Sequence, residues 1–369
     1  MELGILPVIP FWLQLTGGAF ILTMILLLMK LFPSGHTEPV NSVQFNGQGT
    51  EVLSGSNDQS IRRWSVEADH LIPRGIFLKE GKAIRTLRFR PVNNDEIAAG
   101  LENGEVRVTN LLQRDDVRLG AMNNADRVFD LVFSRDSRQM YSAHGSGQVI
   151  PWSVDIRDGN GLAAEQPIQP AQPFAISAIA LLGEQEDLIA IGGRYNRLTV
   201  IDPAQKQSFE VPYEAGGQED YIKSFSVAQQ QPDLLANSDN RGNIALWDFS
   251  ACRKNLKDCQ PITRWTGHGG QSVNAVKLTN DGCFLASAGS DGQAKLWAMD
   301  GLGHRRGQNS EGKVLSKSKK PLNSIDIIRK QDHLLVVTGG DDHRVNLQRI
   351  KLKRSDRRSV NACSNIELN

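Results

Sequence analysis

A six-residue pattern recurs along the chain, with apolar residues at its first, fourth and sixth positions. Seven copies occur, and successive copies begin 44, 44, 48, 46, 51 and 49 residues apart. They are VNSVQF from Val40, IRTLRF from Ile84, VFDLVF from Val128, ISAIAL from Ile176, IKSFSV from Ile222, VNAVKL from Val273 and LNSIDI from Leu322. The last two apolar residues of each copy are two positions apart, as one buried face of a strand requires, so each copy predicts a β-strand.

The residues between the copies complete a regular unit. Each copy is followed by a polar turn, a second apolar strand, a Gly/Asp/Asn turn and a third strand that often ends in tryptophan. A short fourth segment closes most units. Four short strands every 44 to 51 residues predict the blades of an all-β, seven-bladed β-propeller over residues 33–369. A solenoid of helix pairs would show a 3.6-residue period, which is absent.

Two units carry further detail. Residues 35–67 read GHTEPVNSVQFNGQGTEVLSGSNDQSIRRWSVE, and residues 267–300 read GHGGQSVNAVKLTNDGCFLASAGSDGQAKLWAMD. Both resemble the WD repeat, with its Gly-His opening, an aspartate before the third strand and a closing tryptophan. The resemblance covers about residues 35–350. It implies a hydrogen-bonded set of four side chains in each of these blades: His36, Ser54, Asp58 and Trp64 in blade one, and His268, Ser287, Asp291 and Trp297 in blade six.

The His-Ser-Asp content of these sets also resembles a hydrolase triad. A serine held inside a strand would lack access to substrate, so the sets are interpreted as structural and no catalytic residue is assigned. The other blades keep fragments of the pattern. They have Ala99 and Thr109 in blade two; Ser142, Ser146 and Trp152 in blade three; Arg241, Trp247 and Asp248 in blade five; and Thr338, Asp342 and Gln348 in blade seven. Blade four diverges most.

The first 32 residues differ from the rest. Residues 11–29 are 19 uncharged, mostly apolar residues, which reach roughly 28 Å as a helix, enough to cross a bilayer. A cleaved signal peptide is the alternative, but the leader carries Glu2 and no Ala-x-Ala site follows. We therefore expect residues 1–32 to be a single-pass membrane anchor. Lys30, the nearest cation, follows the helix and places the propeller on the cytoplasmic side.

The four cysteines leave the compartment open. Cys252 and Cys259 could close a small disulfide loop in an oxidising compartment, or be two reduced thiols in a surface loop. They lie in one of three long connections after third strands, at residues 155–173, 249–262 and 299–313. We expect these connections on the face opposite the Gly-His loops, where they either contact partners or are neutral insertions.

Two basic clusters are candidates for contact with anionic lipid headgroups or a partner, or are solvated charge runs. They comprise Arg305, Arg306, Lys317, Lys319, Lys320, Lys351, Lys353 and Arg354. A nucleic-acid partner is not expected, because 42 basic residues balance 41 acidic ones and no aromatics stand among these cations. No metal is expected either, since the histidines are scattered and Cys-x-x-Cys is absent, and no cofactor-binding motif is present.

The sequence thus predicts a membrane-anchored protein-interaction scaffold, such as an assembly or regulatory factor for a membrane complex, rather than an enzyme. The alternative is a hydrolase or dehydrogenase that uses the central opening of the propeller. Because residues before Gly35 belong to the anchor, we expect the C-terminus, within residues 358–368, to supply the outer strand of blade seven. About ten residues separate Lys30 from Val40, so the face carrying His36 should lie near the headgroups.

Overall fold

The computed structural model describes residues 35–92, 95–113, 117–121, 126–158, 161–213, 216–300, 312–354, 363 and 366–368. The expected membrane anchor, residues 1–32, lies outside this set. Across the described ranges, no helix has both the length and the apolar character needed to span a bilayer.

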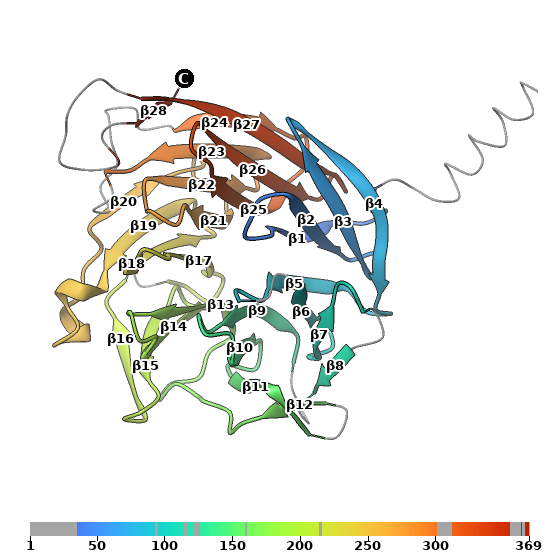
Figure 1. The fold of residues 1–369 in the computed structure, drawn as a ribbon. Coiled ribbons are helices and arrows are strands. Elements are labelled where there is room, and N and C mark those ends of the chain that lie inside the picture. The colour runs from blue at the N-terminus through green and yellow to red at the C-terminus, as the bar shows by residue number, and fades with distance from the viewer. Residues whose placement is uncertain are drawn as a thin grey trace, which may run out of the picture.

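The described strands form seven four-stranded antiparallel blades arranged around one axis (Figure 1). The first four blades are β1 (Val40–Phe45), β2 (Glu51–Ser56), β3 (Ser60–Glu67) and β4 (His70–Lys79); β5 (Ile84–Phe89), β6 (Glu96–Leu101), β7 (Val106–Asn110) and β8 (Val117–Gly120); β9 (Val128–Phe133), β10 (Gln139–His144), β11 (Val149–Asp158) and β12 (Gly161–Ala164); and β13 (Ile176–Leu182), β14 (Leu188–Gly193), β15 (Leu198–Asp202) and β16 (Gln207–Val211).

Three more blades complete the ring. They are β17 (Ile222–Ala228), β18 (Gln231–Asp239), β19 (Asn243–Asp248) and β20 (Thr263–Thr266); β21 (Val273–Leu278), β22 (Phe284–Gly289), β23 (Gln293–Ala298) and β24 (Lys313–Lys317); and β25 (Leu322–Arg329), β26 (His333–Gly340), β27 (Val345–Arg354) and β28 (Ile366–Leu368). Two 3₁₀ turns, η1 (Phe249–Ala251) and η2 (Leu256–Asp258), follow β19. The seven-bladed, all-β prediction is confirmed.

The innermost strand of every blade begins at the first residue of the repeated six-residue pattern. In β1 the burial follows the apolar positions, with Val40, Val43 and Phe45 buried and Asn41 and Gln44 less so. Each inner strand also carries a β-bulge at its second residue, where the register with the next strand shifts. A bulge re-aims the side chain it carries, so these second residues leave the packed faces of the blades.

Blades two and three form one continuous eight-stranded sheet, because β8 and β12 meet at the parallel pair Leu119–Gly161. A buried ion pair lies beside this junction. The Arg118 guanidinium bonds the Glu96 carboxylate at 2.5 Å and donates to the Val154 carbonyl at 2.7 Å in the neighbouring blade. Burying this guanidinium is tolerable because Nη1 and Nη2 donate to these two acceptors, although Nε has no hydrogen-bond partner among the described residues.

The ring closes between blades seven and one. Strand β28, from the C-terminal end, pairs antiparallel with β27 through Leu352–Leu368 and two further residue pairs, so the predicted C-terminal closure is confirmed. A disulfide between Cys363 and Cys283 ties the segment before β28 to blade six. Blade seven also holds blade one, since Asp326 accepts from the Phe45 backbone N–H at 2.8 Å.

The alternating strand directions define two faces. The histidine face is the one at which the inner strands begin, and it carries His36 and His268. The cystine face is the opposite one, where third strands end and both disulfides lie. The described parts of the long connections, 155–158, 161–173 and 249–262, follow third strands and therefore lie at the cystine face, as expected.

Candidate interaction surfaces

The four side chains expected in blade six form one chain of hydrogen bonds. His268 Nδ1 lies 2.9 Å from Asp291 Oδ1, and its Nε2 lies 2.8 Å from Ser287 Oγ. A carboxylate can only accept, so Nδ1 carries the proton and Nε2 accepts from the serine hydroxyl. The Trp297 indole N–H donates to the same Ser287 oxygen at 3.0 Å.

Blade one repeats this arrangement, and its residues also come together. His36 lies 2.9 Å from Asp58 and 2.7 Å from Ser54, and Trp64 donates to Ser54 at 2.8 Å. Burial opposes ionisation of Asp58, but hydrogen bonds from His36, Ser60 and the Thr37 backbone outweigh it and hold the pKa of this carboxyl well below its usual range.

These sets have no room for a substrate. Ser54 and Ser287 are fully buried, and His268 is 1% exposed. Burial lowers the pKa of His268, although Asp291 opposes the shift, so the imidazole is held in its neutral, bridging form. A nucleophile needs an open approach to a reacting atom, which a serine enclosed by imidazole and indole does not have. The two sets therefore act as structural staples, each joining the second strand, the turn and the third strand of its blade.

Blade three contains a substituted staple that the sequence did not reveal. Trp152 donates to Ser142 at 2.8 Å, and Ser142 lies 2.7 Å from Nε2 of His144, a residue of the same strand β10. The other imidazole nitrogen of His144 donates to the Asp126 carbonyl at 2.8 Å. His144 is fully buried, and burial lowers its pKa. Ser146, at the expected aspartate position, takes no part in these bonds.

Blade five contains a second substituted staple. Trp247 donates to the Asn237 side-chain oxygen at 2.7 Å, so an amide stands where blade six has serine. Two residues later, the fully buried Asp239 accepts from the Tyr213 hydroxyl at 3.0 Å. It also accepts from the backbone N–H groups of Arg241 and Asn243, each at 2.9 Å. Arg241 itself pairs with Asp220.

One spacing could have identified these substitutions. In all four staples the indole donates to the residue ten positions before the tryptophan, namely Ser54, Ser142, Asn237 or Ser287. The large polar residues His144 and Asp239 both lie two positions after that acceptor. Blades one and six place the small residues Ser56 and Gly289 there, and a Cβ at Gly289 would lie 2.4 Å from His268 Nδ1. The small residue leaves room for a histidine from the preceding loop.

The connection at residues 249–262 is held firmly to the cystine face. Cys252 and Cys259 form a disulfide, which resolves the alternatives left open by their spacing. Cys259 and Leu256 are buried in the core between blades four and five. Arg253 binds Asp187 at 2.9 Å and Asp233 at 2.8 Å, which together raise its pKa against the effect of burial. This loop is an ordered part of the surface.

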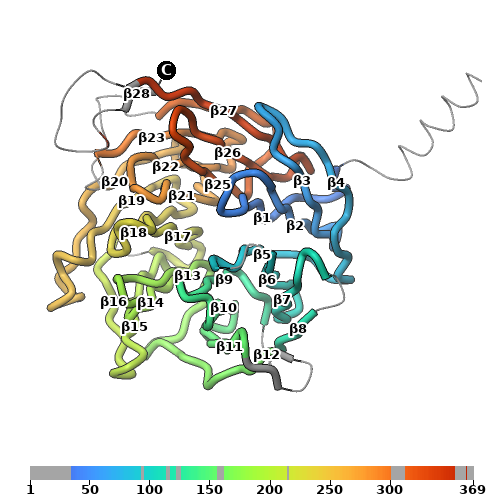
Figure 2. Tube along the Cα trace, viewed as in Figure 1, coloured from blue at the N-terminus to red at the C-terminus, as the bar shows by residue number. Residues whose placement is uncertain are grey.

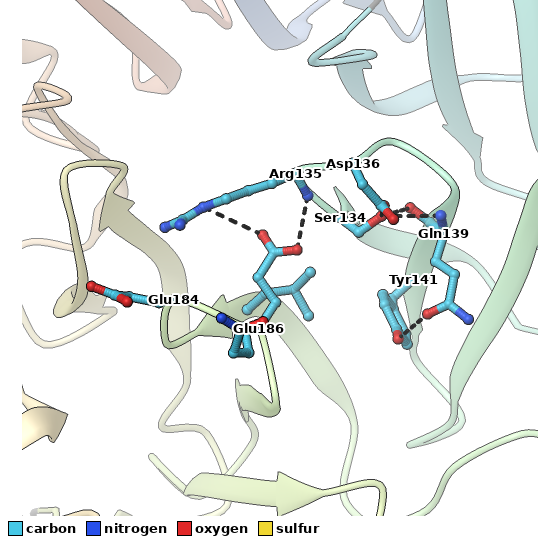
Figure 3. A pocket seen from close by; sticks show the side chains of 9 residues that line it. Ser134, Arg135, Asp136, Gln139, Tyr141, Glu184 and Glu186 are labelled. Atoms are coloured by element: carbon cyan, nitrogen blue, oxygen red, sulfur yellow. Dashed lines mark hydrogen bonds and ion pairs between the residues drawn. The ribbon is translucent and has the colours of Figure 1, made fainter.

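A polar hollow of about 310 Å³ opens on the cystine face between blades three and four (Figure 3). The residues that line it are Ser134, Arg135, Asp136, Gln139, Tyr141, Leu181, Glu184, Gln185 and Glu186. The Arg135 backbone N–H donates to Glu186 at 2.8 Å, and its guanidinium lies 3.8 Å from the same carboxylate. Burial raises the pKa of Glu186, which Arg135 partly offsets. Three carboxylates against one guanidinium make this hollow acidic.

A second hollow of about 440 Å³ lies on the same face between blades six and seven. It is lined by Gln230, Asn280, Asp281, Ile327, Ile328, Arg329, Lys330 and Gln331. Arg329 pairs with Asp281, while the Lys330 ammonium donates to the Gln48 carbonyl. Two cations against one carboxylate give this hollow the opposite charge to the first, so the cystine face carries separated acidic and basic recesses.

The predicted basic clusters do not form one surface. Lys317, Lys319 and Lys320 lie at the end of β24 and in the loop after it, on the histidine face. Lys351, Lys353 and Arg354 lie at the end of β27, on the cystine face. Arg305 and Arg306 are outside the described residues. Because the two described groups end on opposite faces, a flat bilayer could contact one group but not both.

Comparison with known proteins confirms the resemblance in the two most regular blades. The WD40 family (WD domain, G-beta repeat) matches residues 27–65 and 259–298, which contain the staples of blades one and six. The chain therefore carries WD40 repeats on its seven-bladed propeller.

Several curated proteins are similar over most of this chain. Pre-mRNA-processing factor 17 of Homo sapiens is 24% identical over 275 residues, covering 71% of this chain and 43% of the human protein. The non-functional target of rapamycin complex subunit LST8-2 of Arabidopsis thaliana is 23% identical, covering 68% of this chain and 76% of that protein. The ribosome biogenesis protein ytm1 of Aspergillus oryzae is 21% identical, with 73% and 54% covered. The chain thus spans less than half the length of the human relative.

Proposed function

We propose that this WD40-repeat propeller is a protein-interaction scaffold that holds partner proteins at a membrane. The observation that carries the proposal is where the ring places its polar side chains. The serine, histidine and aspartate side chains that could do chemistry in blades one and six are enclosed within staples, which make the blades rigid. Rigid blades keep the loops of both faces in fixed positions, as a binding platform requires.

The cystine face is the main docking surface in this proposal. Its acidic hollow beside Glu184 and basic hollow beside Lys330 offer opposite charges at fixed positions. Complementary charge steers encounter and excludes wrong partners. Two of the relatives support a role in assemblies, since one is named a subunit of a complex and another a ribosome biogenesis protein.

Residues 11–29 anchor the scaffold in this proposal, and the histidine face then lies towards the bilayer because the chain enters the ring beside His36. Lys317, Lys319 and Lys320 are on that face and would meet anionic headgroups. The two disulfides support a propeller in an oxidising compartment. This is the opposite side to the one expected from Lys30, and we give the disulfides more weight because they involve all four cysteines, whereas the orientation rests on one lysine.

Co-purification from detergent extract tests the docking surface. The double substitution Glu184→Arg with Gln185→Arg reverses the charge of the acidic hollow at two exposed positions, so folding should be unaffected. We expect it to remove specific partners, identified by quantitative mass spectrometry, that the unaltered chain retains. Gln205→Arg, at an exposed turn of the same blade, is the matched control and should keep them. Identical partner sets for all three chains would contradict docking at this face.

Thiol labelling of protein taken from intact cells directly into denaturant tests the compartment, because Cys259, Cys283 and Cys363 are buried in the folded chain. With disulfides formed, a maleimide reagent added before reduction should label none of the four cysteines, and should label all four after reduction. Quantitative labelling without reduction would place the propeller in a reducing compartment. Deleting residues 1–32 should release a folded propeller from the membrane fraction, and continued sedimentation of that chain with membranes would contradict anchoring by this segment.

A further inference from the structure

A ring of side-chain bonds joins the inner strands of neighbouring blades on the histidine face. The donors are second residues of inner strands, which lie on the β-bulges. Asn41 donates to the Ile84 carbonyl at 2.8 Å, and Asn274 donates to the Leu322 carbonyl at 2.9 Å. Ser177 and Asn323 make the corresponding bonds to Ile222 and Val40. Each bond reaches the first residue of the next inner strand, so a short neutral donor at this position clamps two blades.

Three blades have a different residue at the clamp position. Blades two, three and five carry Arg85, Phe129 and Lys223 there. Blade five is three blades from blade two, the greatest separation a seven-membered ring allows, so β5 and β17 face each other across the axis (Figure 2). The loss of the neutral clamp therefore introduces two cations on opposite sides of the axis.

Phe129 and Glu102 hold the guanidinium groups near the axis. The Arg85 and Arg127 guanidinium carbons lie 5.7 and 5.8 Å from the centre of the Phe129 ring. Glu102 divides its two oxygens between them, at 3.3 Å from Arg85 and 3.2 Å from Arg127. Asp126 is 4.0 Å from Arg127 and largely exposed. Glu102 and the more distant, exposed Asp126 thus face two guanidinium groups, whose positions are fixed by stacking on Phe129.

Lys223 adds a third cation without a counter-charge. It makes no ion pair or hydrogen bond with any of the residues that the structure describes. Its side chain is exposed, yet burial is the larger cause of its lowered pKa and Arg85 is the other. The exposure of the side chain and the effect of burial on its pKa agree if water reaches the ammonium along the axis while protein surrounds it on the sides. An ammonium in that position is stabilised by an anion.

We propose that Arg85, Arg127 and Lys223 form a binding site for the side-chain carboxylate of an acidic peptide segment, at the axis on the histidine face. A glutamate side chain suits the site because its methylene groups can contact the exposed part of Phe129 while its carboxylate meets the cations. The inference rests on the proposed scaffold function for the source of the anion, a segment of a partner protein. It concerns the opposite face from the two hollows.

The structure supplies substitutions that remove charge without disturbing the ring. Arg85→Asn and Lys223→Asn introduce the residue that blades one, six and seven already use as the clamp. Both variants should therefore fold and melt like the unaltered chain. Lys351→Asn, an exposed cation on the cystine face, is the matched control.

Fluorescence anisotropy of a labelled peptide with four consecutive glutamates, titrated with purified full chain in detergent, tests the site. We expect binding that weakens with added salt, about tenfold weaker binding in Arg85→Asn and Lys223→Asn, and no change in Lys351→Asn. The same peptide with glutamines should not bind.

Three results would overturn the site: no binding of the glutamate peptide, equal binding by all variants, or tighter binding of inorganic phosphate than of the peptide. If peptide binding is absent while partner capture still depends on Glu184 and Gln185, the axial site is wrong and the scaffold function stands. Loss of both would reject the scaffold function itself.

Discussion

Blades five and six are neighbours, and each stabilises its own third strand with different chemistry. Blade six brings His268 from the preceding loop between a serine and an aspartate. Blade five has no loop histidine and instead buries Asp239 under the Tyr213 hydroxyl. In both blades the tryptophan indole donates to the residue ten positions earlier. The tryptophan and its acceptor are thus common to both blades. The polar group beside the acceptor differs, because the residue two positions after the acceptor is small in blade six and large in blade five.

The first prediction tests the shared element. Trp297 and Trp247 are 2% and 1% exposed, so replacing either by alanine leaves a large cavity and an unsatisfied acceptor. We expect Trp297→Ala and Trp247→Ala each to lower the free energy of unfolding by about 3–5 kcal/mol. Chemical denaturation monitored by circular dichroism measures both. A loss confined to blade six would show that the complete WD staple matters and the substituted one does not.

The second prediction contrasts the disulfides of the same two blades. The Cys283–Cys363 bond of blade six closes 80 residues, whereas the Cys252–Cys259 bond of blade five closes seven. A longer loop restricts the unfolded chain more, so we expect Cys283→Ser to cost about 4 kcal/mol and Cys252→Ser about 2 kcal/mol. Melting temperatures without reductant should rank the two variants. Deletion of residues 357–369 should resemble Cys283→Ser, because it removes the same bond and β28; an unchanged melting temperature would reject the closure of blade seven.

The third prediction concerns the two aspartates. Asp239 is fully buried and accepts from the Tyr213 hydroxyl, two backbone N–H groups and the Asn243 amide. Asp291 accepts from His268 and the Gln293 backbone and is partly exposed. We therefore expect Asp239→Ala to cost about 3 kcal/mol and Asp291→Ala about 1–2 kcal/mol. The reverse order in urea denaturation would mean that the motif residue dominates despite its fewer bonds.

The smallest expected effect is a pH dependence to which His268 of blade six should contribute and the staple of blade five should not. Burial lowers the pKa of His268, so below an ordinary histidine pKa of about 6.5 the unfolded chain takes up a proton that the folded chain resists. Stability should consequently fall as the pH drops from 7 to 5. His268→Asn should flatten the slope of melting temperature against pH, and Asn237→Ser in blade five should leave it unchanged. A steeper slope in His268→Asn would mean that folding raises the pKa of His268 and does not lower it, which would contradict the prediction.

Much of the fold could be predicted, because its signals are local and repeated. The starts of the inner strands at Val40 and Val273 follow from the apolar pattern, and the members of the blade-one and blade-six staples follow from their resemblance to WD repeats. His144 and Asp239 were missed, since neither occupies its motif position. The strand pairing places each of them opposite the first residue of the inner strand, and this position makes it part of its staple.

The axial cations show the same limit. Arg85 and Lys223 are far apart in the chain and belong to two copies of a pattern that specifies apolar positions only. Their shared environment arises because the ring brings second residues of opposite blades to one axis.

The sequence by itself determined the number of blades, the starting residue of each inner strand and the closure by the C-terminus, because a strand's apolar period and repeat length are properties of consecutive residues. The tertiary structure alone decided that Cys283 meets Cys363, that the two basic clusters end on opposite faces, and that Arg85 and Lys223 share the axis. Those contacts join residues from different blades, and only closure of the ring brings them within reach of one another.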